Sequence, residues 1–157
     1  MSKARKIPYL NPNQVLNVCL EKILRTRFDE MISFEQGTID GTDIEALHDM
    51  RVASRRVQAV MKIFRAAFPK KKFKTEYAEI KGLIRALGEV RDYDVFIDKL
   101  EKYNTAHPSD DKRAFDLLII RKKAGREQKR KFLIQHINYL NKIGYKEHFY
   151  RFIYTAI

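Results

Sequence analysis

The sequence predicts an all-α protein, most simply a helical bundle of about four to six helices. Apolar residues recur at three- and four-residue steps along most of the chain, which is the spacing of one face of an α-helix. No segment of four or more residues alternates like a strand without fitting a helix better. The chain has 157 residues, 45% of them hydrophobic, so it is long and apolar enough to bury one core. We therefore expect a single helical domain over residues 1–157.

Turn-forming and capping residues set the expected helix boundaries. Thr42 or Asp43, and later Asp92, are suited to cap the helices that follow them, because their side chains accept hydrogen bonds from free backbone N–H groups. The expected interruptions are a turn over 37–42, Pro69 with a lysine-rich loop after it, Gly88, the break at His107-Pro108-Ser109, and Gly144. The expected helices cover about 13–36, 43–68, 75–90, 92–104 and 109–141, followed by a short aromatic segment over 145–157.

Several protein classes lose support from the composition. The longest unbroken aliphatic stretch, Leu117–Ile120, is far shorter than the roughly 20 residues of a membrane-spanning helix. The first residues lead into no apolar segment of the kind that a signal peptide requires. The single cysteine, Cys19, cannot form an intrachain disulfide or a thiolate metal cage. We therefore expect a cytoplasmic protein.

The positive charge is concentrated in two segments. The chain has 32 Lys and Arg against 20 Asp and Glu, a formal net charge of +12. Residues 43–75 hold 9 basic residues against 3 acidic ones, and residues 112–131 hold 9 against 2, whereas charges in the rest of the chain nearly cancel. A basic surface also keeps small proteins soluble. Clustering of this kind nevertheless favours a polyanionic partner.

The expected helix over 43–68 has an apolar side and a cationic side. The apolar side, which we expect in the core, collects Ala46, Met50, Ala53, Val57, Val60, Met61, Phe64, Ala67 and Phe68. The opposite side collects His48, Arg51, Arg55, Lys62 and Arg65, with Gln58 among them and Arg56 at its edge. Asp49 is the only carboxylate between His48 and Lys74, so these cations repel one another, at a cost of roughly a few tenths of a kcal/mol per pair. A chain of phosphates would turn that repulsion into attraction.

Two later segments carry cations in similar series. One side of the expected helix over 75–90 collects Lys74, Tyr77, Lys81, Arg85 and Gly88. Consecutive helices joined by a short loop usually pack side by side, so the two cationic sides are expected to form the walls of one groove. The long helix over 109–141 is expected to add Arg121, Lys122, Lys129 and Arg130. Forked arginine donors and mobile lysine charges together suit an irregular chain of phosphates.

His48 lies beside Arg51 and Arg55 on the cationic side of its helix. Bound phosphate favours the charged imidazole, so the affinity for a polyanion is expected to rise as pH falls. The remaining histidines, His107, His136 and His148, have no such surroundings and are interpreted as structural.

The sequence does not favour an enzyme. Asp92, Asp94 and Asp98 could bind magnesium, but a helix cap at Asp92 and pairing with nearby basic residues explain them better. Ser54 has no His–carboxylate relay to activate it, and the sequence contains no glycine-rich phosphate loop. We therefore expect no catalytic residue, no bound metal and no cofactor.

Two sequence blocks resemble a known family. The first is Leu47-His48-Asp49-Met50-Arg51-Val52-Ala53-Ser54-Arg55-Arg56, followed by Phe64-Arg65, and the second is Leu87-Gly88-Glu89-Val90-Arg91-Asp92-Tyr93-Asp94-Val95. In this order and at this separation they resemble the conserved histidine α-helical domain, CHAD, over about residues 43–100. The resemblance implies an all-helical, non-enzymatic module that binds inorganic polyphosphate along a basic groove and is found with polyphosphate granules.

The resemblance also implies which residues contact phosphate. These are His48, Arg51, Arg55, Arg56, Lys62, Arg65, Lys81, Arg85 and Arg91, to which the helical series add Lys74, Lys122 and Lys129. Gln58 stands where many members have another basic residue. Typical members are much longer and contain two related bundles, and the stretch from His148 to Arg151 does not reproduce the motif of the second. A homodimer that restores a two-bundle channel is therefore a further expectation.

Two other functions are compatible with the same residues. A helical protein with this net charge would also bind DNA or RNA through phosphates, although Gln58 and Tyr77 offer little for reading or stacking bases. The second alternative is a polyphosphate or nucleotide phosphohydrolase that holds magnesium on Asp92, Asp94 and Asp98.

Overall fold

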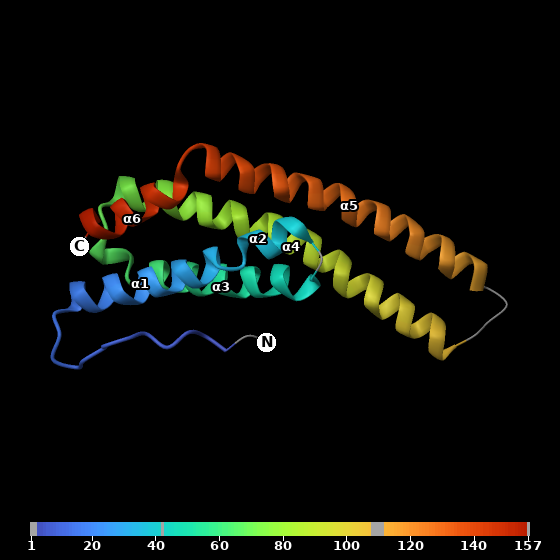
Figure 1. Cartoon of the computed structure of the whole chain (residues 1–157), viewed down its shortest axis with the longest axis horizontal. Coiled ribbons are helices and arrows are strands. Elements are labelled where there is room, and N and C mark those ends of the chain that lie inside the picture. The colour runs from blue at the N-terminus through green and yellow to red at the C-terminus, as the bar shows by residue number, and fades with distance from the viewer. Residues whose placement is uncertain (1–2, 42, 108–111, 157) are drawn as a thin grey trace.

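A computed structural model describes residues 3–41, 43–107 and 112–156 of the chain (Figure 1). Its helices are α1 (Leu16–Ile32), α2 (Glu35–Asp40), α3 (Ile44–Ile63), the short 3₁₀ helix η1 (Arg65–Ala67), α4 (Lys70–Ala106), α5 (Lys112–Lys142) and α6 (Tyr145–Ala156). No strand occurs in these described ranges. The predicted all-α class is therefore confirmed. None of the described helices is both long enough and apolar enough to cross a membrane.

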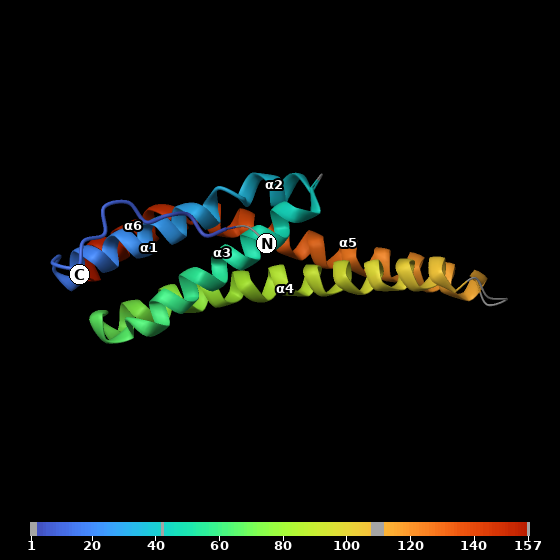
Figure 2. The same cartoon turned by 90° about the horizontal axis from the view of Figure 1, so that it is seen from below.

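The two longest helices, α4 and α5, run antiparallel and side by side (Figure 1). The other helices pack against one end of this pair, and the far halves of α4 and α5 project beyond them (Figures 1 and 2). Figure 2 shows α4 and the end of α3 along one side of the molecule, with α1, α2 and α6 along the opposite side. The cationic series of α3 and α4 therefore belong to neighbouring helices, as the sequence predicts.

Apolar side chains from α1, α3, α4, α5 and α6 form one core. Its fully buried members include Leu20, Leu24, Phe28, Met50, Met61, Ile80, Leu87, Leu133, Ile137, Phe149 and Ile153. Phe28 of α1 stacks on Phe149 of α6 with ring centroids 4.1 Å apart, which joins the two ends of the chain. The buried residues of α3 include Met50, Ala53, Val57 and Met61, which were expected on its apolar side. Arg51, Arg55 and Lys62 are left on the outer side of the helix.

A buried carboxylate connects the N-terminal segment with α1 and α3. The side chain of Glu30 is 1% exposed. It accepts hydrogen bonds from the guanidinium groups of Arg27, at 3.0 Å, and Arg56, at 2.8 Å, and from the backbone N–H of Arg5, at 3.2 Å. Burial of an ionised carboxylate is tolerated only when such donors surround it. Arg56 thereby fixes the rotation of α3 relative to α1.

The boundary between the first helices differs from the prediction. The expected helix over 13–36 begins later and ends at Ile32, and the expected turn over 37–42 is largely the helix α2. Gly41 ends α2 in the left-handed region, with φ of 68°, where glycine has no steric penalty. The predicted cap at Asp43 is confirmed, because its side chain accepts a hydrogen bond from the backbone N–H of Glu45 at 2.8 Å. Thr42 lies outside the described residues.

The predicted helices over 75–90 and 92–104 are a single helix, α4, so both the break at Gly88 and the cap at Asp92 are wrong. An interior glycine costs about 1 kcal/mol relative to alanine. Burial of Leu87 and Val90 on the two sides of Gly88 outweighs that cost. The lysine-rich loop is also wrong: Pro69 is the N-cap of α4, and Lys70 begins the helix.

The predicted ends of the two long helices agree better with the structure. α4 ends at Ala106, directly before the expected break at His107-Pro108-Ser109, of which only His107 is described. Gly144, with φ of 65°, separates α5 from α6 as expected. The expected start of the last long helix, at Ser109, lies outside the described residues.

Candidate functional site

The outer side of α3 and η1 presents a row of cations. Arg55 and Lys62 of α3 and Arg65 of η1 are exposed, and Arg51 is half-buried. The steps between successive members are four, seven and three residues, with Gln58 in the longest gap, so the cations lie about 5–11 Å apart along the helix axis. The buried side of α3 holds the row in place, because rotation of the helix would expose Met50 and Met61.

The first half of α4 lies beside this row and carries its own cations. Lys70, Lys74, Lys81 and Arg85 are exposed on one side of the helix. The two helices meet closely where Arg51 Nε lies 3.7 Å from the position that a Cβ would occupy on Gly88. We use the name basic face for this surface, which consists of Arg51, Arg55, Lys62, Arg65, Lys70, Lys74, Lys81 and Arg85.

One end of the basic face is hollowed into a pocket, which we call the basic pocket. It has a volume of about 490 Å³ and is lined by Arg65, Lys70, Phe73, Lys74, Tyr77, Ala78 and Lys81. The lining contains four cationic side chains and no carboxylate. An anion bound here would therefore meet no repelling charge from the lining.

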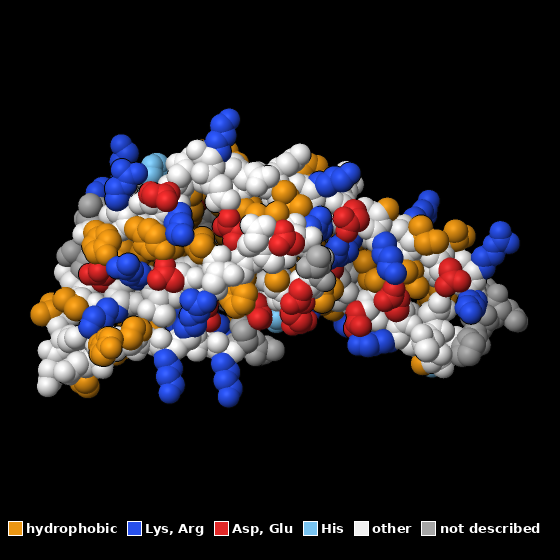
Figure 3. Space-filling model, in the orientation of Figure 1, with side chains coloured by type: hydrophobic (Ala, Val, Ile, Leu, Met, Phe, Trp, Pro, Cys, Tyr) orange, Lys and Arg blue, Asp and Glu red, His pale blue; other side chains and the backbone are white. Residues whose placement is uncertain are grey.

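The cations of the basic face are unpaired. Within residues 3–41, 43–107 and 112–156, none of them forms an ion pair or hydrogen bond through its side chain. Ion pairs form on other surfaces, including Lys102–Asp98, Lys123–Glu101 and Lys129–Glu89. Figure 3 shows the side of the molecule on which α1 and α2 lie, where acidic side chains are interspersed among basic ones. The basic face thus collects eight cations that have no ion-pair partner among the described residues.

Arg56 and Arg91, which were also assigned to phosphate contact, lie outside the basic face. Arg56 faces α1 and is bound to Glu30, on the other side of α3 from the basic face. Arg91 is half-buried on α4, beyond Gly88. The structure therefore does not bring Arg56 together with Arg51 and Arg55.

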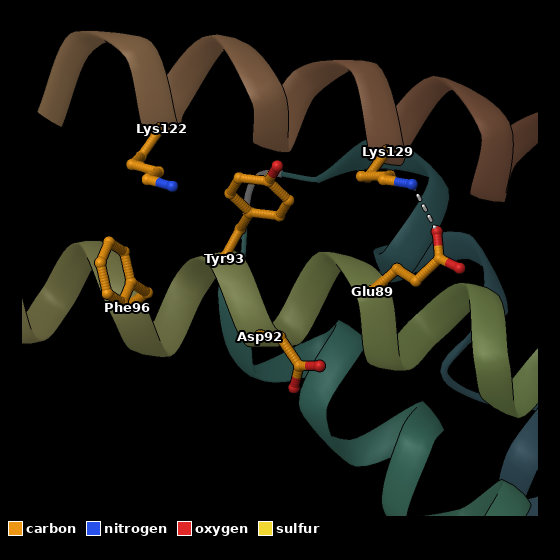
Figure 4. Close-up of a pocket in the computed structure, with 6 residues that line it drawn as sticks. All are labelled: Glu89, Asp92, Tyr93, Phe96, Lys122 and Lys129. Carbon is orange, nitrogen blue, oxygen red and sulfur yellow. Dashed lines mark ion pairs between the residues drawn. The ribbon is translucent and has the colours of Figure 1, made fainter. Parts of the chain in front are cut away.

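Lys122 and Lys129 of α5 line a separate pocket with α4. This pocket has a volume of about 340 Å³ and is lined by Glu89, Asp92, Tyr93, Phe96, Lys122 and Lys129 (Figure 4). Lys129 Nζ lies 2.9 Å from Glu89 Oε2, and this hydrogen bond and the carboxylate charge raise the pKa of Lys129. Lys122 Nζ lies 5.1 Å from the centre of the Phe96 ring. The two α5 lysines that the sequence analysis expected to contact phosphate thus lie in a pocket of mixed charge, outside the basic face.

His48 has acidic as well as basic neighbours. One ligand atom from each of Glu45, His48 and Asp49 lies within 4.8 Å of the others, and no other such group occurs among the described residues. The Nδ1 atom of His48 has no hydrogen-bond partner among those residues. Because two carboxylates adjoin the imidazole, its surroundings are less cationic than the sequence prediction assumed.

The three aspartates considered for magnesium do not form one site. Asp94, which is 1% exposed in its side chain, accepts a hydrogen bond from Arg126 Nε. Asp98 pairs with Lys102 at 2.8 Å, and Asp92 lines the pocket of mixed charge. Ser54 is buried and donates its hydroxyl to the carbonyl oxygen of Met50 at 2.7 Å, so it is not placed as a nucleophile.

The sequence analysis did not identify Lys70 and Phe73 of the basic pocket. Both fell in the segment that the sequence analysis treated as a loop, although they continue the three- and four-residue steps of Lys74, Tyr77 and Lys81. That spacing is the signal that would have identified them. Arg126 was also missed as the partner of Asp94, because 32 residues separate the two in sequence.

Comparison with known families gives one match. The family described as "CHAD domain" matches residues 22–139, which include the basic face, the basic pocket and all twelve residues assigned to phosphate contact. No curated protein matches the chain.

The neighbouring residues Arg55 and Arg56 should have separable roles. We predict that Arg56→Ala lowers the free energy of unfolding by about 1–3 kcal/mol, because it deprives the buried carboxylate of Glu30 of a donor. Arg55→Ala, at an exposed position with no ion pair among the described residues, should change it by less than about 0.5 kcal/mol. Urea denaturation of the two variants measures both values, and equal losses would contradict this division.

Proposed function

The chain belongs to the CHAD family, and from that premise we propose that it binds inorganic polyphosphate on the basic face. The observation that carries the proposal is the absence of ion-pair partners for that face among the described residues. A folded protein with 20 carboxylates could neutralise such a row locally. A linear polyanion would supply the missing negative charge along the whole row.

The arrangement suits a chain of phosphates more than a single phosphate. Apart from Arg65 on η1, the cations lie on the adjacent helices α3 and α4, so a chain can be contacted from both sides over several helical turns. Arginine forks would hold individual phosphate oxygens, and the lysines would follow an irregular chain as mobile charges. Arg51 Nε is a buried donor without an acceptor among the described residues, which a phosphate oxygen could satisfy after a small side-chain movement.

We assign the main contacts to the basic face, with His48 and Arg91 at its far end. Three of the residues that the family resemblance or the helical series suggested would contribute less. Arg56 and Lys129 already pair with Glu30 and Glu89, and Lys122 lies over Phe96. Releasing such a partner would offset part of the energy gained from phosphate.

The proposed role is binding without turnover. Asp94 is paired with Arg126, Asp98 is paired with Lys102, and the hydroxyl of Ser54 is buried. These contacts argue against the phosphohydrolase alternative. Release of inorganic phosphate from polyphosphate in the presence of magnesium or manganese would overturn this part of the proposal.

Nucleic acid is the main competing ligand, since unpaired cations attract any phosphate backbone. The basic face contains no asparagine, and Gln58 of α3 is the amide that the sequence places among its cations. The basic face therefore offers few side chains that could form specific hydrogen bonds with base edges. We propose that binding of DNA or RNA is non-specific and secondary.

We also propose that two copies associate through the projecting ends of α4 and α5. Two helices alone cannot cover their apolar residues, and Phe96, Leu117 and Ile120 are 44%, 58% and 62% exposed there. The same pair from a second copy would complete a four-helix arrangement and supply the second bundle that longer family members contain.

The proposed ligand also suggests a location. A protein that holds long polyphosphate chains would be retained on polyphosphate granules in the cytoplasm. A fluorescent fusion that stays evenly dispersed in cells rich in such granules would contradict this part of the proposal.

Single substitutions on the basic face test phosphate contact. We predict that Arg55→Ala and Lys81→Ala each weaken binding to long-chain polyphosphate and lower the slope of log affinity against log salt by about one unit, because each removes one contact. Lys131→Ala, which removes an exposed charge on α5, is the matched control and should leave the slope unchanged. Titration at several salt concentrations measures the slopes, and equal behaviour of all three variants would show that the basic face is not the site.

The dimer has its own test. At concentrations on the order of tens of micromolar, the chain should sediment as a dimer, and Leu117→Glu combined with Ile120→Glu should sediment as a monomer with weaker polyphosphate binding. Both positions are exposed, so the fold should persist. A wild-type monomer with full affinity for polyphosphate would refute the proposal.

A further inference from the structure

The basic pocket contains an apolar surface that inorganic polyphosphate does not need. Phe73 and Tyr77 lie one helical turn apart on α4, and their rings stack with centroids 5.2 Å apart and planes inclined by 17°. The guanidinium of Arg65 lies 5.8 Å from the centre of the Phe73 ring. Both rings line the pocket, but Phe73 is the buried member of the stack and Tyr77 is only partly buried. One aromatic surface is thus available to a ligand.

The cations of the pocket adjoin that surface. Lys70, Lys74 and Lys81 come from the same helix, α4, with one turn between the first two and two turns between the last two, and Arg65 lies on η1. Ala78, also in the lining, is small and leaves space beside the ring of Tyr77. The Tyr77 hydroxyl has no hydrogen-bond partner among the described residues and remains free to contact a ligand. The pocket therefore combines a flat apolar surface with four positive charges.

We propose that the basic pocket binds a nucleoside triphosphate, with the base stacked on Tyr77 and the phosphates held by Arg65, Lys70, Lys74 and Lys81. Four cations match the charge of a triphosphate, which is close to −4 when no metal is bound. The pocket volume of about 490 Å³ lies within the range of small-molecule sites. Stacking of a base on an aromatic side chain adds affinity that a bare phosphate chain cannot gain.

This inference rests on the proposed function, because it uses cations of the same basic face, but it adds a second class of ligand at one end. A long polyphosphate chain and a nucleotide would then compete for the basic pocket. Occupation by nucleotide would shorten the surface open to the chain, leaving Arg51, Arg55 and Arg85 outside the pocket free for it.

The experiment measures the contributions of the base and of the phosphates to affinity separately. Dissociation constants for ATP, tripolyphosphate and adenosine would be measured calorimetrically without divalent metal, on the wild-type chain and three variants. For the wild type we expect ATP to bind roughly tenfold more tightly than tripolyphosphate. Tyr77→Leu should remove that preference and leave tripolyphosphate binding unchanged. Tyr77→Phe keeps the ring and should keep the preference, as should the matched control Tyr139→Leu, which removes an exposed tyrosine on α5.

The outcomes distinguish this inference from the proposed function. Equal affinities of ATP and tripolyphosphate in the folded wild-type protein, with long-chain polyphosphate still bound, would overturn the inference alone. A preference for ATP that survives Tyr77→Leu, with folding verified by circular dichroism, would also overturn it. If ATP, tripolyphosphate and long-chain polyphosphate all failed to bind, both this inference and the proposed function would be overturned.

Discussion

Electrostatic repulsion along α3 and the first half of α4 is the constraint on which the account of function depends. Eight cations line α3, η1 and α4, and no described carboxylate pairs with any of them. Hydrophobic packing maintains this arrangement, because the opposite sides of the same helices bury Met50, Met61, Ile80 and Leu87. The core thus holds the helices in a position that their charges oppose. A polyanion would remove the repulsion without any change of fold.

The chain has 20 carboxylate side chains, but two of the buried ones connect helices and do not neutralise the basic face. Glu30 joins α1, α3 and the N-terminal segment, and Asp94 joins α4 to α5 through Arg126. Both are nearly fully buried and accept hydrogen bonds from arginine. Arginine therefore has two roles in this fold: Arg56 and Arg126 hold helices together, whereas Arg55 projects from the surface. The arginines that hold helices together are those whose carboxylate partner is buried.

The sequence predicted the helical class, the apolar side of α3 and the placement of Arg51, Arg55, Lys62 and Arg65 on its outer side, because helical periodicity determines all three. It failed where tertiary packing outweighs local preference. Gly88 was expected to end a helix that the core continues through. The roles of Arg56 and Lys129 depended on Glu30 and Glu89, whose proximity arises only in the folded chain. Phe73 was missed for a different reason: its segment was expected to be a loop, whereas α4 begins at Lys70.

Competition between polyanions tests the central claim most directly. Long-chain inorganic polyphosphate, duplex DNA and duplex RNA of matched total charge would be titrated against the protein at about 150 mM salt, where weak non-specific attraction is screened. We predict that polyphosphate binds by orders of magnitude more tightly, because a bare phosphate chain can follow the row of cations that have no ion-pair partner among the described residues. Equal affinities that fade together as salt increases would contradict it and would identify the basic face as a generic cationic surface.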